Sequence, residues 1–410
     1  MSRLAAAVLL ALAGRLAAAP PAGSADAPEL AACLQWLRAL DAEVAAAGAR
    51  DLEYSRVPGF PYLRVDTFLA QARERASRSD AAFAAFADRL LEHDLESRRY
   101  EIDNLPAAVV EKFSGMRFDD SRAIALRRTR QCGRLLREAQ LADPRKRAAL
   151  IARAAVEPAP PAPACPAPGA ASAGARVRYA PPPAAASRED AARWLLRGAS
   201  DPLGQARLSE AELGALAAAY APSLEVTVAS DADRFGALRW GRAAAPPRID
   251  ATEPAVYVAR RYGYYEGRAL LQLEYTLRFP GHRIAWRVTL APDGEPLVYD
   301  ALGADGCRTV VLTPRARLRG AAAAPTQTLP SARAGERPLL ALAAGTHALR
   351  ALGLVRGSDS LARYALRPYR ELRSSPTFDR RNRAAAGRPP FAGQAPLDER
   401  LVLDLAEARP

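Results

Sequence analysis

Histidine and cysteine are the side chains of this sequence best suited to catalysis or metal binding, and both are scarce. The 410 residues include three histidines and four cysteines, at His93, His282, His347, Cys33, Cys132, Cys165 and Cys307. His93 lies on an expected helix without a second histidine four residues away, the spacing that zinc-binding helices use. We therefore expect His93 to be a surface residue and histidine chemistry to depend on His282 and His347.

The candidate binding site combines four residues, His282, Asp305, Cys307 and His347. His282 lies at a strand junction, and His347 follows an apolar strand. Side chains at strand ends of a β scaffold can converge on a pocket. A divalent metal held there would suit a hydrolase, and a Cys307–His347 nucleophilic pair is another possible use. In an oxidising compartment, a structural disulfide at Cys307 is the competing expectation.

No local motif of a known catalytic or cofactor site is present in the sequence. CxxC, HExxH, GxSxG, the Walker loop and GxGxxG are all missing. Chemistry would therefore have to come from residues brought together by the fold, and we expect no cofactor.

The stretch 255–314 has the strongest strand pattern of the chain. Apolar residues alternate along two segments, at Leu271, Leu273, Tyr275, Leu277, Phe279, Ile284, Trp286, Val288 and Leu290. The intervening polar residues are Gln272, Glu274, Thr276, Arg278, Arg287 and Thr289. Such alternation predicts antiparallel strands with one buried and one solvated face.

The rest of the chain divides by composition. We expect a helical domain over 28–156, a Pro/Ala-rich linker over 157–186, an antiparallel β domain with two leading helices over 187–370, and an irregular Arg-rich tail over 371–410. Within the tail, the leucines at 401, 403 and 405 could add a short strand. The predicted class is α+β, with a helical N-terminal domain joined to an antiparallel β-sandwich-like domain.

The first 27 residues have the features of a cleavable signal peptide. Arg3 precedes an apolar run of suitable length, and small residues follow. We expect a periplasmic or secreted protein with no transmembrane span after cleavage. In that compartment Cys33 and Cys132 are the preferred disulfide pair, and Cys165 and Cys307 either pair across the linker or stay free. Lipidation of Cys33 is a further alternative.

The formal net charge of +13 comes almost wholly from arginine, because Lys112 and Lys146 are the only lysines. The arginines are scattered among acidic residues, whereas nucleic-acid binders concentrate them in a stripe with stacking aromatics. We therefore expect no nucleic-acid partner. Association with anionic envelope surfaces is one consequence that the charge allows.

Several segments resemble a group of uncharacterised exported proteobacterial proteins. The similar segments are 57–69, 271–280, 286–290 and 296–300. In that group a run of the form H-x-C-G-C-Y-H follows the Tyr-Asp pair, which is Tyr299-Asp300 here. Only Gly306 and Cys307 match the run, so the metal or redox role that it would imply lacks most of its residues.

A shorter segment is similar to the G-H-R-H-D-W-E motif of necrosis-inducing-protein-like β-sandwich proteins. Gly281, His282, Arg283 and Trp286 coincide with that motif. Ile284, Ala285 and Arg287 replace the second histidine and the two acids that would hold a cation. The resemblance implies a β-sandwich that has kept its sheet and lost its cation site.

Three hypotheses about function follow from these observations. The first is a non-catalytic envelope protein whose β domain is a binding or structural module, because the core pattern is complete and catalytic residues are few. The alternative is a divalent-metal-dependent hydrolase or cytolysin-like protein with a degenerate site. A third possibility is a helical module over 29–156 that docks a partner through an exposed apolar patch.

Overall fold

A computed structural model describes residues 27–115, 120–156, 173–240, 247–319, 326–356, 362–373, 389–391 and 401–405. Helices and strands are arranged in antiparallel and mixed sheets, which confirms the α+β class. The predicted signal peptide and most of the predicted tail lie outside the described residues. No helix within the described ranges has the length and apolar character needed to cross a bilayer.

The N-terminal part is built from helices around a two-stranded hairpin. The helices are α1 (Ala27–Ala46), α2 (Thr67–Gln71), α3 (Arg73–Ala76), α4 (Asp80–Asn104), α5 (Ala107–Ser114), α6 (Asp120–Leu141) and α7 (Pro144–Arg153). The hairpin consists of β1 (Ser55–Val57) and β2 (Phe60–Val65). The Asp66 side chain accepts a hydrogen bond from the Leu69 backbone and caps α2.

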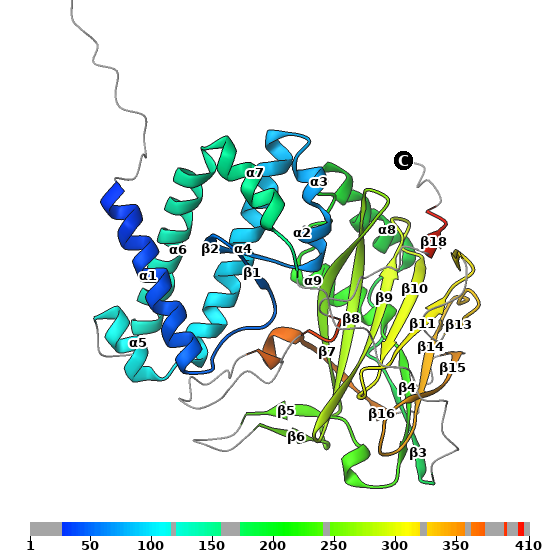
Figure 1. Ribbon diagram of the computed structural model, residues 1–410. Coiled ribbons are helices and arrows are strands. Elements are labelled where there is room, and N and C mark those ends of the chain that lie inside the picture. The colour runs from blue at the N-terminus through cyan, green and yellow to red at the C-terminus, as the bar shows by residue number, and fades with distance from the viewer. Residues whose placement is uncertain are drawn as a thin grey trace, which may run out of the picture.

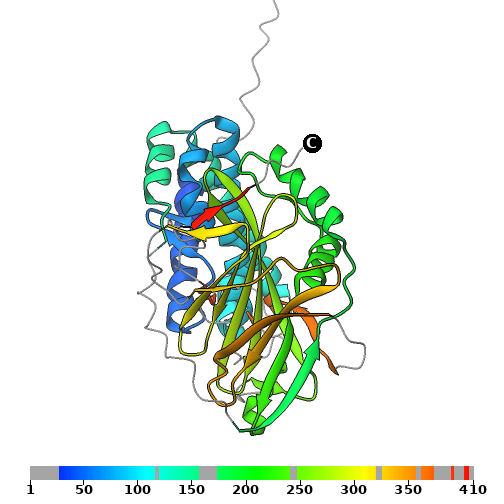
Figure 2. The same ribbon diagram turned by 90° about the vertical axis from the view of Figure 1, so that its right-hand side faces the viewer.

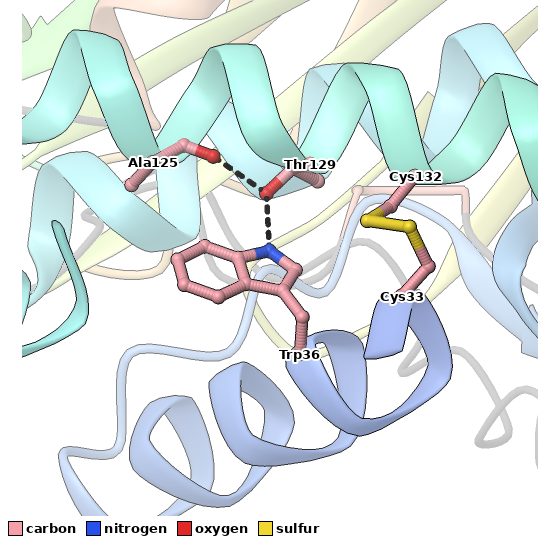
Figure 3. The surroundings of a disulfide bond; sticks show 5 residues. All are labelled: Cys33, Trp36, Ala125, Thr129 and Cys132. Carbon is pink, nitrogen blue, oxygen red and sulfur yellow. Dashed lines mark hydrogen bonds between the residues drawn. A yellow bond between two sulfur atoms is a disulfide. The ribbon is translucent and has the colours of Figure 1, made fainter. Parts of the chain in front are cut away.

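A disulfide fixes the packing of α1 against α6 (Figure 3). Cys33 and Cys132 are bonded across a sequence separation of 99 residues, which confirms the predicted pair. One turn along α1, Trp36 Nε1 donates to Thr129 Oγ1 at 3.3 Å. The Thr129 hydroxyl in turn donates to the Ala125 carbonyl at 2.8 Å. Because the Cys33 thiol is used in this bond, it is not free for lipidation.

The predicted meander forms the centre of a seven-stranded sheet. Its strands are β7 (Ala255–Tyr265), β8 (Arg268–Phe279), β9 (His282–Leu290), β10 (Pro296–Leu302) and β11 (Arg308–Leu312), each paired antiparallel with the next. The short strands β13 (Thr326–Thr328) and β17 (Ala365–Pro368) extend the two edges in parallel orientation.

A second sheet of five strands packs on one face of the first. Its order is β15 (Leu349–Arg356), β14 (Glu336–Leu342), β4 (Ser223–Val228), β3 (Ala175–Ala180) and β16 (Ala362–Arg363). Apolar side chains of both sheets form one core, including Val226, Leu340, Leu273 and Trp286. In Figure 2 the green and orange strands of this sheet lie in front of the larger one.

Two features of this sheet differ from the sequence prediction. β3 falls inside the range assigned to the linker and pairs with β4, because a short strand between Pro-rich segments leaves little compositional trace. β14 and β4 run parallel, as do β16 and β3, so the sheets are not purely antiparallel. The two predicted leading helices, α8 (Arg188–Leu196) and α9 (Glu210–Tyr220), precede β4, and a capping box of Ser209 and Glu212 begins α9.

The other face of the seven-stranded sheet is also covered, which corrects the predicted solvated face. Gln272, Glu274, Thr276, Arg287 and Thr289 are all buried. Figure 1 shows the N-terminal helices on this side of the long strands and the five-stranded sheet on the opposite side. A polar row of side chains is therefore enclosed between the sheet and the helical part.

Residues after the β domain tie the two parts together. The Arg373 guanidinium, which is buried after a short 3-10 helix (Tyr369–Leu372), donates to Asp51 at 2.8 Å and to Glu96 at 2.5 Å. Further on, β18 (Leu401–Leu403) pairs with β12 (Ala316–Leu318), in agreement with the short strand expected there.

Candidate functional site

A cavity of about 480 Å³ lies where the β1 region and the start of α2 face the seven-stranded sheet. Its walls come from residues 50–58 and 64–68, from the centres of β7, β8 and β9, and from the end of α7. Pro389 and Phe391 complete the lining. Ligand pockets commonly have volumes of roughly 300–1,000 Å³ and occur where two structural units meet. This cavity therefore has the size and position of a small-molecule site.

Three charged residues in neighbouring strands form the row beneath the cavity. Glu274 on β8 is opposite Arg287 on β9, and Arg287 is opposite Asp300 on β10. The Arg287 guanidinium donates twice to Asp300 Oδ2, at 2.8 and 3.0 Å. Arg308 donates to the other carboxylate oxygen of Asp300. Burial would raise the pKa of Asp300, but these two arginines outweigh it and hold the pKa below its usual value.

Glu274 is in a different electrostatic state. It is only 1% exposed, and its Oε1 atom has no hydrogen-bond partner in the described part of the chain. Burial is the main cause that raises the pKa of Glu274, and the like charge of Glu53 raises it further. Arg261 and Arg287 act in the opposite direction but are outweighed. A buried carboxyl group that lacks a direct partner is costly to fold, so a bound ligand could supply the missing contact.

Glu53 and Arg261 form an ion pair through one carboxylate oxygen and one guanidinium nitrogen. Arg261 Nη1 contacts Glu53 Oε1, whereas Arg261 Nη2 and Glu53 Oε2 find no hydrogen-bond partner among the described residues. Burial lowers the pKa of Arg261, but Glu53 and then Glu274 raise it by more. The lining of the cavity thus contains one guanidinium donor and one carboxylate acceptor without a hydrogen-bond partner.

A second group of charges lies at the β1–β2 side. Arg64 is fully buried and donates to Asp94 at 3.1 Å and to Glu101 at 2.8 Å. Arg56 is paired with Asp41, yet its Nε and Nη2 atoms lack hydrogen-bond partners in the described ranges. This side of the cavity therefore also presents guanidinium donors.

Two of the aromatic rings near the cavity, those of Tyr54 and Phe391, have partners on their faces. The Tyr54 ring stacks on His93 at 3.9 Å between centroids, and the Arg373 guanidinium lies 5.5 Å from it. Phe391 lies 4.0 Å from the Arg287 guanidinium. His93 is also 3.3 Å from Asp66 and is partly buried, so its predicted place as a surface residue is wrong.

The structure brings together two of the four residues of the candidate binding site predicted from the sequence, His282 and His347. His282, at the start of β9, and His347, in the turn between β14 and β15, have Nε2 and Nδ1 atoms 2.5 Å apart. His347 is buried and stacks on Phe279 at 3.8 Å, and its Nε2 lies 3.1 Å from Asp233 Oδ1. That contact is within ion-pair distance but is not aligned as a hydrogen bond. Burial and the neighbouring His282 lower the pKa of His347 to about 4.

The facing nitrogens of these two histidines lie within hydrogen-bond distance of each other. An ion at ~2.05 Å from two ring nitrogens at a tetrahedral angle would separate those atoms by ~3.3 Å, which is more than the distance between them here. No three His, Cys, Asp or Glu side chains in the part of the chain that the structure describes are grouped to hold a metal. Asp233, the third member of this cluster, was not anticipated from the sequence.

The other two predicted residues occupy the turn between β10 and β11. The Asp305 carboxylate accepts from the Cys307 backbone at 2.9 Å, which is a local turn contact. Cys307 is disulfide-bonded, so it is not the thiolate that a nucleophilic Cys307–His347 pair would require. Cys165, the other cysteine considered for this bond, lies outside the described residues.

The strand residues that line the cavity, Gln272, Glu274 and Arg287, were missed because they were assigned to a solvated face. One sequence signal could have identified them. Glu274, Arg287 and Asp300 each lie near the middle of a strand, at positions that a meander places side by side. Charges at the centre of three neighbouring strands are unusual on an open face unless they are paired.

Comparisons of the chain with protein-family models, with curated proteins and with solved structures found no match. Function is therefore inferred from the residues of the cavity alone.

Proposed function

We propose that this protein is a non-catalytic binding protein of the cell envelope that holds a small polar ligand between its helical part and its β-sandwich-like part. The observation that supports this proposal is the cavity of about 480 Å³ with two buried acids, Glu53 and Glu274, each of which has one carboxyl oxygen without a hydrogen-bond partner among the described residues. Leaving buried polar groups unsatisfied costs ~1–3 kcal/mol each. A ligand that satisfies them recovers this energy on binding.

Binding is favoured over catalysis by the types of residue present. Among the residues that the structure describes, those that line the cavity include no histidine and no cysteine. The histidines that a metal-dependent hydrolase would use, His282 and His347, lie within hydrogen-bond distance of each other. Glu53 is held by Arg261. These are features of a site that recognises charge.

Export agrees with two further observations. The Cys33–Cys132 disulfide is typical of proteins that fold in an oxidising compartment, and the N-terminal residues have the pattern of a signal peptide. We place the protein in the periplasm or outside the cell on these grounds. Contact with anionic envelope surfaces through the net charge of +13 is part of the same proposal.

Native mass spectrometry tests the proposed function. The purified full chain is exchanged into a volatile buffer with a small-molecule extract of the producing cells, and bound species are identified after denaturation. We expect one small-molecule adduct on the native chain, and its loss in the Glu274→Gln variant. Glu266→Gln is the matched control, because Glu266 is exposed at the tip of the same hairpin. Absence of any adduct on the folded chain would contradict the proposal.

A further inference from the structure

We propose that the ligand of this cavity is a zwitterion with an ammonium and a carboxylate group, namely a free amino acid or a short peptide. This inference rests on the proposed binding function and specifies its ligand. Three observations support it. Polar atoms of the cavity wall lack hydrogen-bond partners, these atoms belong to both acids and bases, and aromatic rings of the wall are packed against other side chains.

The cavity-lining atoms without partners belong to acidic and basic side chains. Among the lining residues that the structure describes, the buried side-chain atoms without hydrogen-bond partners are Glu53 Oε2, Glu274 Oε1, Arg56 Nε, Arg56 Nη2 and Arg261 Nη2. Glu53 and Glu274 are more than nine-tenths buried. Amides or hydroxyls, which commonly orient neutral ligands, are not among them: Gln272 Nε2 is already bonded to Thr289 Oγ1 at 3.0 Å.

Both signs of charge are open at once, which selects the ligand. An ammonium group donates to carboxylates, so it is the group that would satisfy Glu53 Oε2 and Glu274 Oε1. A ligand carboxylate accepts from guanidinium groups, so it would satisfy Arg261 Nη2 and Arg56 Nε. Charge-assisted hydrogen bonds are roughly twice as strong as neutral ones. A simple anion would satisfy only the arginines and would be repelled by the two acids, and a simple cation would meet the opposite difficulty.

A neutral sugar is the main competitor, because hydroxyl groups both donate and accept. A sugar also has an apolar face, which would pack on an aromatic ring whose own face is free. Here the Tyr54 ring is stacked against His93 with Arg373 also nearby, and Phe391 is against Arg287. The other two aromatic residues of the lining, Phe68 and Tyr262, pack against each other at a tilted angle, and Phe68 is buried. The zwitterion needs no free aromatic face and uses the open charges fully.

Thermal-shift and calorimetric titrations of the full chain with defined probes test this inference. The probes are an equimolar pool of the protein amino acids, a pool of dipeptides and tripeptides, the same peptides with acetylated amino termini, the same peptides with amidated carboxyl termini, and a pool of neutral saccharides. We expect the first or the second pool to raise the melting temperature and to bind in calorimetry. Which of the two does so distinguishes amino acids from peptides.

Blocking either terminus should weaken binding by more than tenfold, because each block removes one charge-assisted contact. Glu274→Gln should weaken binding of the active pool by more than tenfold, whereas Glu266→Gln should leave it unchanged. Because Gln keeps the shape of Glu, a preserved melting temperature shows that this loss is not caused by unfolding. Equal binding of blocked and free peptides, or binding of saccharides alone, would overturn the zwitterion while leaving a binding protein. No response to any probe, together with an adduct of another class in the native spectra, would also overturn only the ligand class.

Discussion

Glu274 and Arg287 are directly opposite each other on β8 and β9, yet the Arg287 guanidinium donates two hydrogen bonds to Asp300 on the far side. Glu274 is therefore a buried acid whose Oε1 atom has no partner in the described chain, although a guanidinium lies on the adjacent strand. The same face of the sheet thus carries two different acids. Asp300 is bound by two arginines, whereas Glu274 has a carboxyl oxygen without a partner among the described residues. Two substitutions separate these roles.

Replacement of Glu274 by Gln should leave the folded protein equally stable or stabilise it by about 1 kcal/mol at neutral pH, because it removes the cost of burying a charge. The pKa of Glu274 is raised in the folded state from 4.5. The folded wild type therefore holds its proton to higher pH than the unfolded chain and loses stability as the pH rises above about 4.5. The advantage of the variant should grow over the same range. Urea denaturation at several pH values measures this, and a loss of several kcal/mol would contradict it.

Replacement of Asp300 by Asn should have the opposite effect. It leaves Arg287 and Arg308 without their shared carboxylate in a buried position, and breaking a buried ion pair from one side costs about 3–5 kcal/mol. The same urea titration measures the loss. Because the pKa of Asp300 is lowered in the folded state, its stabilising effect is present above its unfolded pKa and disappears as the acid is protonated below it. A variant as stable as the wild type would show that the pairing contributes nothing.

The histidine pair predicts a loss of stability in mild acid. Burial lowers the pKa of His347 from 6.5 to about 4, so the unfolded chain binds this proton more readily than the folded chain between these values. Unfolding free energy should therefore fall as the pH decreases from about 6.5 towards 4, by about 3 kcal/mol in total. Equilibrium denaturation at closely spaced pH values gives the slope.

His347→Asn is the matched control for this slope. His347 has a φ of 51°, a left-handed conformation that asparagine tolerates better than most residues. The variant should keep its turn, and its stability should change less than that of the wild type between pH 6.5 and 4. An identical slope in both proteins would assign the acid sensitivity to other groups.

The sequence predicted those parts of the fold that depend on neighbouring residues. The alternation in β8 and β9 is a local pattern, and the two strands are found where it predicted them. β3 was missed because its pairing with β4 depends on residues about 50 positions later in the chain. Alternation gives the period of a strand but not the layer that covers its second face. This is why the polar face of β8 was assigned to solvent.

The same limit applies to the candidate site. His282 and His347 were grouped because both lie at strand ends, and the structure does bring them together. Asp233 completes their cluster from a short 3-10 helix that carries no distinctive pattern. Glu53 and Arg261 meet only because the segment before β1 packs on β7, more than 200 residues away. A charge pair of this kind depends on the packing of two units and cannot be read from spacing.

The Cys33–Cys132 disulfide should contribute a large part of the stability of the helical part. It closes a loop with a sequence separation of 99 residues, and removal of such a bond costs ~2–5 kcal/mol because the unfolded chain gains conformational freedom. The Cys33→Ser/Cys132→Ser double variant should unfold at correspondingly lower urea without reductant. The Trp36–Thr129 hydrogen bond joins the same two helices, so Trp36 fluorescence should report the loosening of α1 from α6. A variant with unchanged midpoint and fluorescence would show that helix packing alone holds these two elements together.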